Sequence, residues 1–209
     1  MQEFLCDYAG LMVEGQKGHP EVKPSVMSLT SAKQMRALAH PLRLQILGEL
    51  RVAGPRTVSL LSEIFDEAPG TLSYHLSKLA EFGFVQEVPE LASDKRERWW
   101  RASHDFTDIS PAGTGASPSV RHASEAMRHQ VVDVYAATLH RVVEVAEGLP
   151  DDWANAATSG DTVAYLTAAE LAQASAELNA VAEKWHALHD RAHADTEAVQ
   201  IMVHAFRRP

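Results

Sequence analysis

The stretch that decides the fold is TVSLLSEIFDEAPGTLSYHLSKLAEFG, residues 57–83. Apolar residues recur at helical spacing on both sides of the short connection Asp66–Ala68, which predicts two helices joined by a tight turn. Thr57 is a favourable N-cap for the first helix, and Pro69 fits the first turn of the second. This arrangement is typical of a helix-turn-helix, whose second helix fits the major groove of DNA.

The second helix has an apolar face formed by Leu72, Leu76 and Leu79, and short polar residues near its start. Free N–H groups at the start of the first helix favour phosphate. The residues of the two helices expected to contact DNA are Thr57, Ser59, Pro69, Gly70, Thr71, Ser73, Tyr74, His75 and Lys78. The alternative role for Tyr74 is packing, and the alternative role for His75 is a helix cap or a core contact.

Two β-rich stretches follow, Phe84–Val88 and Glu97–Ala102, with a polar tip between them. They predict a hairpin packed beside the helices, the wing of a winged helix-turn-helix. Lys95, Arg96 and Arg98 are expected to flank the duplex and to make this wing basic.

Upstream, Ser31 and Gln34 have the spacing of a capping box, and Pro41 suits the start of the next helix. The winged helix-turn-helix is therefore expected to span residues 31–103. Residues 1–30 are rich in Gly and Pro and are interpreted as a flexible arm. An arm that crosses to a second subunit is the alternative.

Residues 104–118 contain Pro, Gly and Ser and are expected to be a linker. A long amphipathic helix is predicted from about 119 to 147, and a second one from about 167 to 193. Residues 161–166 and 199–206 are predicted to be strands. The whole chain is therefore expected to be mainly α with small β (α+β), with a helical module at 119–209 that contains a short two-stranded sheet.

This C-terminal module is expected to form a homodimer, because its apolar stripes exceed what one small module covers. The residues assigned to dimerisation are Met127, Val131, Val134, Leu139 and Val142.

The charge and composition limit the function further. The net charge is −9, yet residues 31–103 contain ten Lys or Arg against nine Asp or Glu, so the acidity lies elsewhere. Cys6 is the only cysteine, which excludes an internal disulfide and favours a reducing compartment. Neither a signal peptide nor a membrane span is evident, so a cytoplasmic protein is expected. The sequence contains no Gly-rich phosphate loop and no recognisable pairing of nucleophile and base, so an enzyme is not expected.

LAHPLRLQILGEL (38–50) and PGTLSYHLSKLAEFGFV (69–85), followed by the basic hairpin, resemble the ArsR-type bacterial repressors. The similarity is greatest to the branch with an extended helical C-terminal region. This resemblance implies a homodimeric repressor that binds double-stranded DNA at a two-fold symmetric operator. It also implies that Thr71, Ser73, Tyr74, His75 and Lys78 read the bases. A winged helix that binds protein instead of DNA is the alternative function.

The effector is not evident from the sequence. The thiolate site of ArsR-type sensors needs cysteines in the helix at about 57–65, and none is there. Histidine-rich faces leave a metal site open against plain solvent exposure. Their residues are His122, Glu125, His129 and His140 on the long helix, and His186, His189 and His193 near the last helix. No cofactor is assigned. A small-molecule pocket between the C-terminal helices also stays open, since Tyr135, Trp153 and Trp185 suit a pocket as well as a core or a dimer contact.

Overall fold

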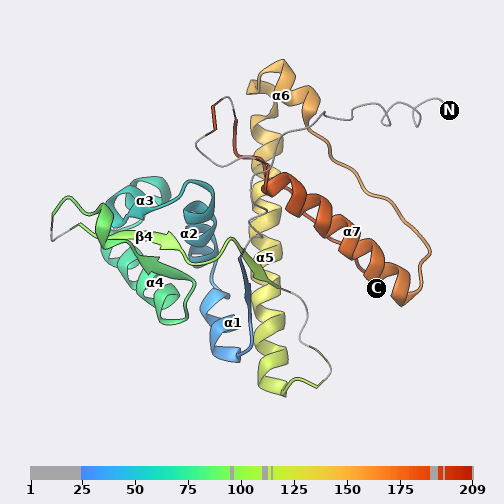
Figure 1. The fold of residues 1–209 in the computed structure, drawn as a ribbon, viewed down its shortest axis with the longest axis horizontal. Helices are drawn as coiled ribbons and strands as arrows, with labels where there is room; N and C mark the ends of the chain where they lie inside the picture. The colour runs from blue at the N-terminus through green and yellow to red at the C-terminus, as the bar shows by residue number, and fades with distance from the viewer. Residues whose placement is uncertain are drawn as a thin grey trace.

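The computed structural model describes residues 25–94, 97–109, 113, 115–188, 193–194 and 196–208. Within them the protein is mainly helical with two small sheets, an α+β fold (Figure 1). The N-terminal elements are β1 (Val26–Ser28), α1 (Ala32–Leu38), α2 (Pro41–Val52), β2 (Arg56–Thr57), α3 (Val58–Phe65), α4 (Pro69–Glu81), β3 (Val85–Glu87), η1 (Pro89–Leu91), β4 (Trp99–Ala102) and β5 (Phe106–Asp108). The remaining elements are α5 (Pro118–Val145), η2 (Ala146–Gly148), α6 (Asp151–Ala156) and α7 (Ala168–His186).

The helix starts follow the local sequence. Ser31 and Gln34 form the predicted capping box at α1, and Pro41 occupies the first turn of α2. Gly83 adopts a positive φ of 77° two residues after the end of α4, where its N–H donates to the carbonyl of Ala80 at 3.0 Å. Glycine adopts this conformation without the steric penalty of a Cβ, so α4 ends here and the chain turns into the hairpin.

The predicted wing is present. β3 and β4 pair antiparallel with Val85 opposite Ala102, and β2 joins the other edge of β4 to give the sheet order β2-β4-β3. Because β2 immediately precedes α3, this third strand fixes the start of the helix-turn-helix to the wing.

A second sheet lies where the sequence indicated an arm and a linker. β1 and β5 pair in parallel, with Val26 opposite Phe106, and Asp105 accepts hydrogen bonds from the N–H and the hydroxyl of Ser25 at 2.8 and 2.9 Å. Residues 26–28 and 106–108 are therefore structured. Three-residue strands from distant parts of the chain leave no periodic signal, which is why the sequence did not indicate this pairing.

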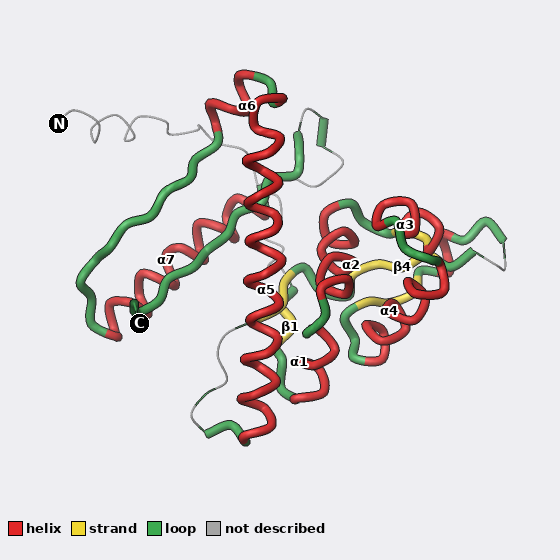
Figure 2. Tube along the Cα trace, turned by 180° about the vertical axis from the view of Figure 1, so that it is seen from behind, coloured by secondary structure: helices red, strands yellow, loops and turns green. Residues whose placement is uncertain are grey.

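One core joins the helix-turn-helix to the first half of α5. Leu38, Ile46, Leu72, Leu76 and Phe84 are almost completely buried and belong to the same cluster as two residues of α5. These two residues are Ala123 and Met127. In both views α5 stands as a long rod against α1 (Figures 1 and 2). The expected linker therefore does not separate two cores.

The C-terminal part corrects two expectations. Residues 161–166 and 199–206 contain no strand, so the predicted two-stranded sheet of this module is wrong. Alternating apolar residues form a strand only when a neighbouring strand satisfies the backbone, and no described segment pairs with either stretch. α7 begins at the predicted capping box of Thr167 and Glu170 but ends at His186, and the short α6 was not predicted. None of the described helices is both long and apolar enough to cross a membrane.

Candidate nucleic-acid interface

α3 and α4 are held at a fixed angle by their connection. Asp66 ends α3 in the left-handed conformation with φ 51°, and the hydroxyl of Ser62 donates to the carbonyl of Glu67 at 2.6 Å. These contacts keep the turn short, so the start of α4 has a defined position relative to α3.

α4 has one buried and one accessible side. Leu72, Leu76 and Leu79 have no exposed surface, whereas Tyr74 is 58% exposed. Pro69 and Gly70 are exposed, and Thr71 and Ser73 are half-buried. No side chain caps the start of α4, because residue 68 is alanine. The N–H groups of Gly70 and Thr71 therefore lie at an uncapped helix N-terminus, which favours an anion.

His75 does not lie on the accessible side. It is buried, and its ring packs against that of His40 at 4.5 Å and against that of Tyr74 at 5.3 Å between centroids. Burial lowers the pKa of His75, and neighbouring His40 and Arg43 lower it further. The expectation that His75 reads bases is therefore wrong for this structure: its position, three residues after Leu72 and four before Leu79, turns it toward the core.

Thr57 is also occupied within the fold. It is buried, and its hydroxyl accepts the N–H of Leu60 at 3.2 Å as the N-cap of α3. Its side chain stabilises the helix start and is not available as a phosphate contact. Ser59, two residues later, is exposed.

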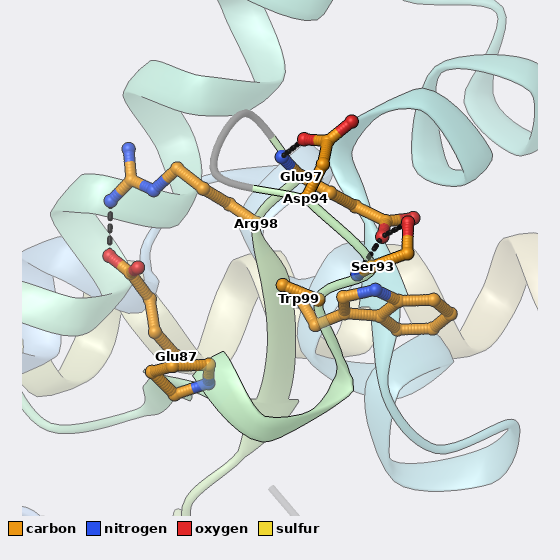
Figure 3. A pocket seen from close by; sticks show the side chains of 8 residues that line it. Glu87, Ser93, Asp94, Glu97, Arg98 and Trp99 are labelled. Carbon is orange, nitrogen blue, oxygen red and sulfur yellow. Dashed lines mark hydrogen bonds and ion pairs between the residues drawn. The ribbon is translucent and has the colours of Figure 1, made fainter.

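Two of the predicted cations are paired with carboxylates. Lys78 forms an ion pair with Glu81 at 2.8 Å, which raises the pKa of the lysine. Arg98 donates a hydrogen bond to Glu87 within an ion pair, and this hydrogen bond lowers the pKa of the Glu87 carboxyl (Figure 3). The Arg98 guanidinium also lies over the Trp100 ring, 5.0 Å from its centroid.

The hairpin is close to neutral rather than basic. Residues 85–102 contain four acidic and four basic residues. Glu97 accepts the N–H and the hydroxyl of Ser93, both at 2.8 Å, and Asp94 accepts the N–H of Glu97, so these two acids hold the tip together (Figure 3). Lys95 and Arg96 lie outside the described residues. The expectation of a basic wing therefore needs correction.

Arg43 and His40 are important residues that the sequence analysis did not assign. Arg43 donates to the carbonyls of Arg36 and Ala37 and so ties the C-terminal end of α1 to α2. His40 precedes α2 and supplies the ring that contacts His75. Both residues belong to the segment LAHPLR. Through His40 this segment packs against His75 on the buried side of α4.

The metal candidates do not converge in the part of the chain that is described. His122, Glu125, His129 and His140 are exposed along α5, and no group of three or more potential ligands exists among the described residues. The ring of His186 contacts that of Phe106 at 4.8 Å, and His193 contacts the carbonyl of Ala194. His189 lies outside the described residues.

The dimerisation candidates divide into two groups. Met127 and Val131 are buried within the protein itself, Met127 in the core that also contains α1, so their assignment to a subunit contact is corrected. Val134 is half-buried, and Leu139 and Val142 are 53% and 52% exposed. Only the later part of α5 therefore presents an apolar surface.

The family model described as a helix-turn-helix domain matches residues 38–88. Among solved structures the chain is similar to an apo double mutant of ZitR from Lactococcus lactis, with 18% identity, a TM-score of 0.30, and coverage of 70% of this chain and 83% of that chain. It is also similar to a cysteine-to-serine mutant of MarR from E. coli complexed with operator DNA, with 19% identity, a TM-score of 0.29, and coverage of 56% and 86%.

The search of curated proteins gave no significant match. The family match and the geometry of α3, α4 and the hairpin agree on the same segment. Residues 38–88 of this chain form a helix-turn-helix domain.

Proposed function

We propose that this protein is a DNA-binding transcription regulator of the ArsR type, a homodimer that represses from a two-fold symmetric operator. The observation that supports this best is the start of α4, where Thr71, Ser73 and Tyr74 surround an uncapped helix N-terminus within a matched helix-turn-helix domain. Such a regulator works in the cytoplasm, where its operator lies. No enzymatic activity is proposed.

Within this proposal Tyr74 and the short side chains of Thr71 and Ser73 read base edges. Hydroxyl groups bond to several bases, and an aromatic face contacts thymine methyl groups. Gly70 lets the phosphate backbone approach closely, since nothing lies within 4 Å of the position a Cβ would take. Lys78, whose partner Glu81 is on the same helix, exchanges that carboxylate for a phosphate on binding.

The low positive charge has a consequence for binding. Lys78 is the only Lys or Arg within residues 57–83, against four acidic residues. Electrostatic attraction then contributes little, and the affinity of the dimer for DNA should fall with salt at a slope of about −4 or shallower on logarithmic axes.

The test is selection of bound fragments from a random DNA pool, followed by affinity measurements on the selected sequence. Enrichment of an inverted repeat supports the proposal. Y74A and T71A should each weaken binding to this sequence about 5–100-fold, with little change in binding to unrelated DNA. The matched control is S77A on the same helix, because the Ser77 hydroxyl donates to the Ser73 carbonyl.

The acidic balance of α3 and α4 favours one second candidate, a winged helix that binds a basic protein partner. This candidate predicts no enriched DNA sequence at any salt concentration. Failure of the selection at low salt would therefore favour the protein-binding role over the regulator.

A further inference from the structure

The C-terminal part of the protein has no core of its own. Beyond Val131 no described residue is buried, and this includes all 19 residues of α7. Seventeen large apolar side chains in this part are exposed, from 38% at Trp153 to 99% at Tyr165. A helix of this length is only marginally stable in water without packing, so α7 needs a surface to cover it.

α7 presents a regular apolar stripe. Leu171, Leu178 and Trp185 are seven residues apart, Ala174 and Val181 fall between them, and Leu188 follows in the turn two residues after α7 ends, all at spacings of three and four. This is the spacing of a seam that packs against another helix. The four larger residues from Leu178 onward are 46–54% exposed. We refer to these six residues as the α7 stripe.

α5 has a second apolar face besides the one that enters the core. The spacings are again four and three, which place these side chains on one side of the helix, about 100° from the buried Val131. This outer face consists of Val132, Ala136, Leu139, Val143 and Ala146. Val132, Leu139 and Val143 are 55%, 53% and 75% exposed, so the outer face has no partner among the residues that the structure describes.

α7 is connected in a way that allows it to reach another molecule. Its C-terminal end lies near β5, where His186 contacts Phe106, while its N-terminal end lies away from α5 (Figure 1). Residues 157–167 before it contain no helix or strand and are all exposed. Eleven extended residues span about 36 Å, so α7 is not confined to α5 of its own chain.

We propose that the α7 stripe of one subunit packs on the outer face of α5 of a second copy, and reciprocally, so that the subunits exchange their C-terminal helices. The inference rests on the homodimer of the proposed function and specifies which surfaces form it. Because a two-fold axis relates the two copies, each copy covers the α7 stripe and the α5 outer face of the other at the same time. A partner with one binding surface would cover only one of them.

The exposed area fits a second copy. Seven of these seventeen side chains belong to the α7 stripe or to the outer face of α5, and they expose on the order of 700 Å² per copy, at about 100 Å² each. A standard interface buries about 800 Å² on each partner, and obligate dimers bury more. Packing of the α7 stripe on the outer face of α5 therefore buries close to the area of a standard interface.

The test uses two cysteine variants in a chain with Cys6→Ser. One chain contains Val143→Cys and the other Val181→Cys, with tags of different size; they are unfolded together, refolded and treated with a short thiol-to-thiol crosslinker. The expected result is a covalent heterodimer that contains one chain of each kind. The matched control is Ala137→Cys mixed with Ala180→Cys, since both positions are exposed on the same helices but off the stripes.

Three results would overturn the exchange. The first is a crosslink within a single chain that contains both cysteines, which places α7 on its own α5. The second is a crosslink only between two Val143→Cys chains, which indicates that the outer faces of α5 meet directly. The third is rapid maleimide labelling of both cysteines in the native protein, which leaves the stripes uncovered. DNA binding is measured on the same samples, so a regulator that binds its operator but lacks the mixed crosslink refutes the exchange alone.

Discussion

His75 links the recognition helix to the residues that support it. Its ring lies between those of His40 and Tyr74, and neither histidine Nδ1 has a hydrogen-bond partner among the described residues. A buried imidazole without a partner resists protonation, because the charged form loses its hydration. This pair therefore makes the fold sensitive to mildly acidic solution.

We expect the free energy of unfolding to decrease as the pH falls below about 6.5. The unfolded histidines gain protons from there downward, whereas the folded pair, whose pKa values are lowered, stays neutral to lower pH. His75→Leu should remove part of this decrease. Urea unfolding at pH values from about 7.5 to about 5.5 measures the effect, with the exposed His122→Gln as the control. An unchanged slope in H75L would contradict the assignment.

Arg43 is a second residue whose role is structural. Its guanidinium contacts two carbonyls at the end of α1, a geometry that an ammonium group does not reproduce. Arg43→Lys should destabilise the protein by about 1–2 kcal/mol in urea unfolding. Arg128→Lys, at an exposed position of α5, should have an effect within about 0.5 kcal/mol. Equal stability of R43K and the parent would show that the two carbonyl contacts contribute nothing.

Helix starts and the hairpin could be predicted from the sequence because their causes are local. Ser31 with Gln34 and Thr167 with Glu170 satisfy their own helix termini within four residues, and both capping boxes are present. The strands predicted at 161–166 and 199–206 depended on a distant partner that the pattern does not specify. The site shows the same division: Tyr74 is exposed as expected, but the pairing of Glu87 in β3 with Arg98, the residue before β4, was not predicted.

The cap of α3 gives a prediction at the level of the element. Thr57→Ala removes the oxygen that accepts the Leu60 N–H and should cost about 1 kcal/mol of stability. Thr57→Ser keeps the oxygen and should be close to the parent. At temperatures where both variants are folded, their DNA affinities should agree. A loss of affinity in T57A with unchanged stability would restore the phosphate contact that the sequence suggested.

For the molecule as a whole, the uncovered C-terminal part predicts that stability depends on association. The midpoint of thermal unfolding should rise with protein concentration, because a folded dimer is favoured by mass action. Scanning calorimetry over about a hundredfold range of concentration measures this. Leu178→Asp on the α7 stripe should lower the midpoint and remove most of its concentration dependence, whereas Ala180→Asp, on the opposite side of the helix, should not. A midpoint independent of concentration in the parent would contradict the dimer.

α5 enters the core of the helix-turn-helix with its first half and presents its outer face with the second. Its 28 residues form one uninterrupted helix about 42 Å long, so no hinge separates the two ends. In a dimer held by that outer face, α5 moves as a rigid rod, so a rotation of its C-terminal half also moves the helix-turn-helix packed on its first half. If α5 tilts by about 10° about its C-terminal end, a group about 20 Å from that end moves by roughly 3.5 Å, which is close to the rise of one base pair. Two recognition helices must match major grooves about 34 Å apart, so a small change in how the C-terminal helices pack is enough to move them out of register with the operator.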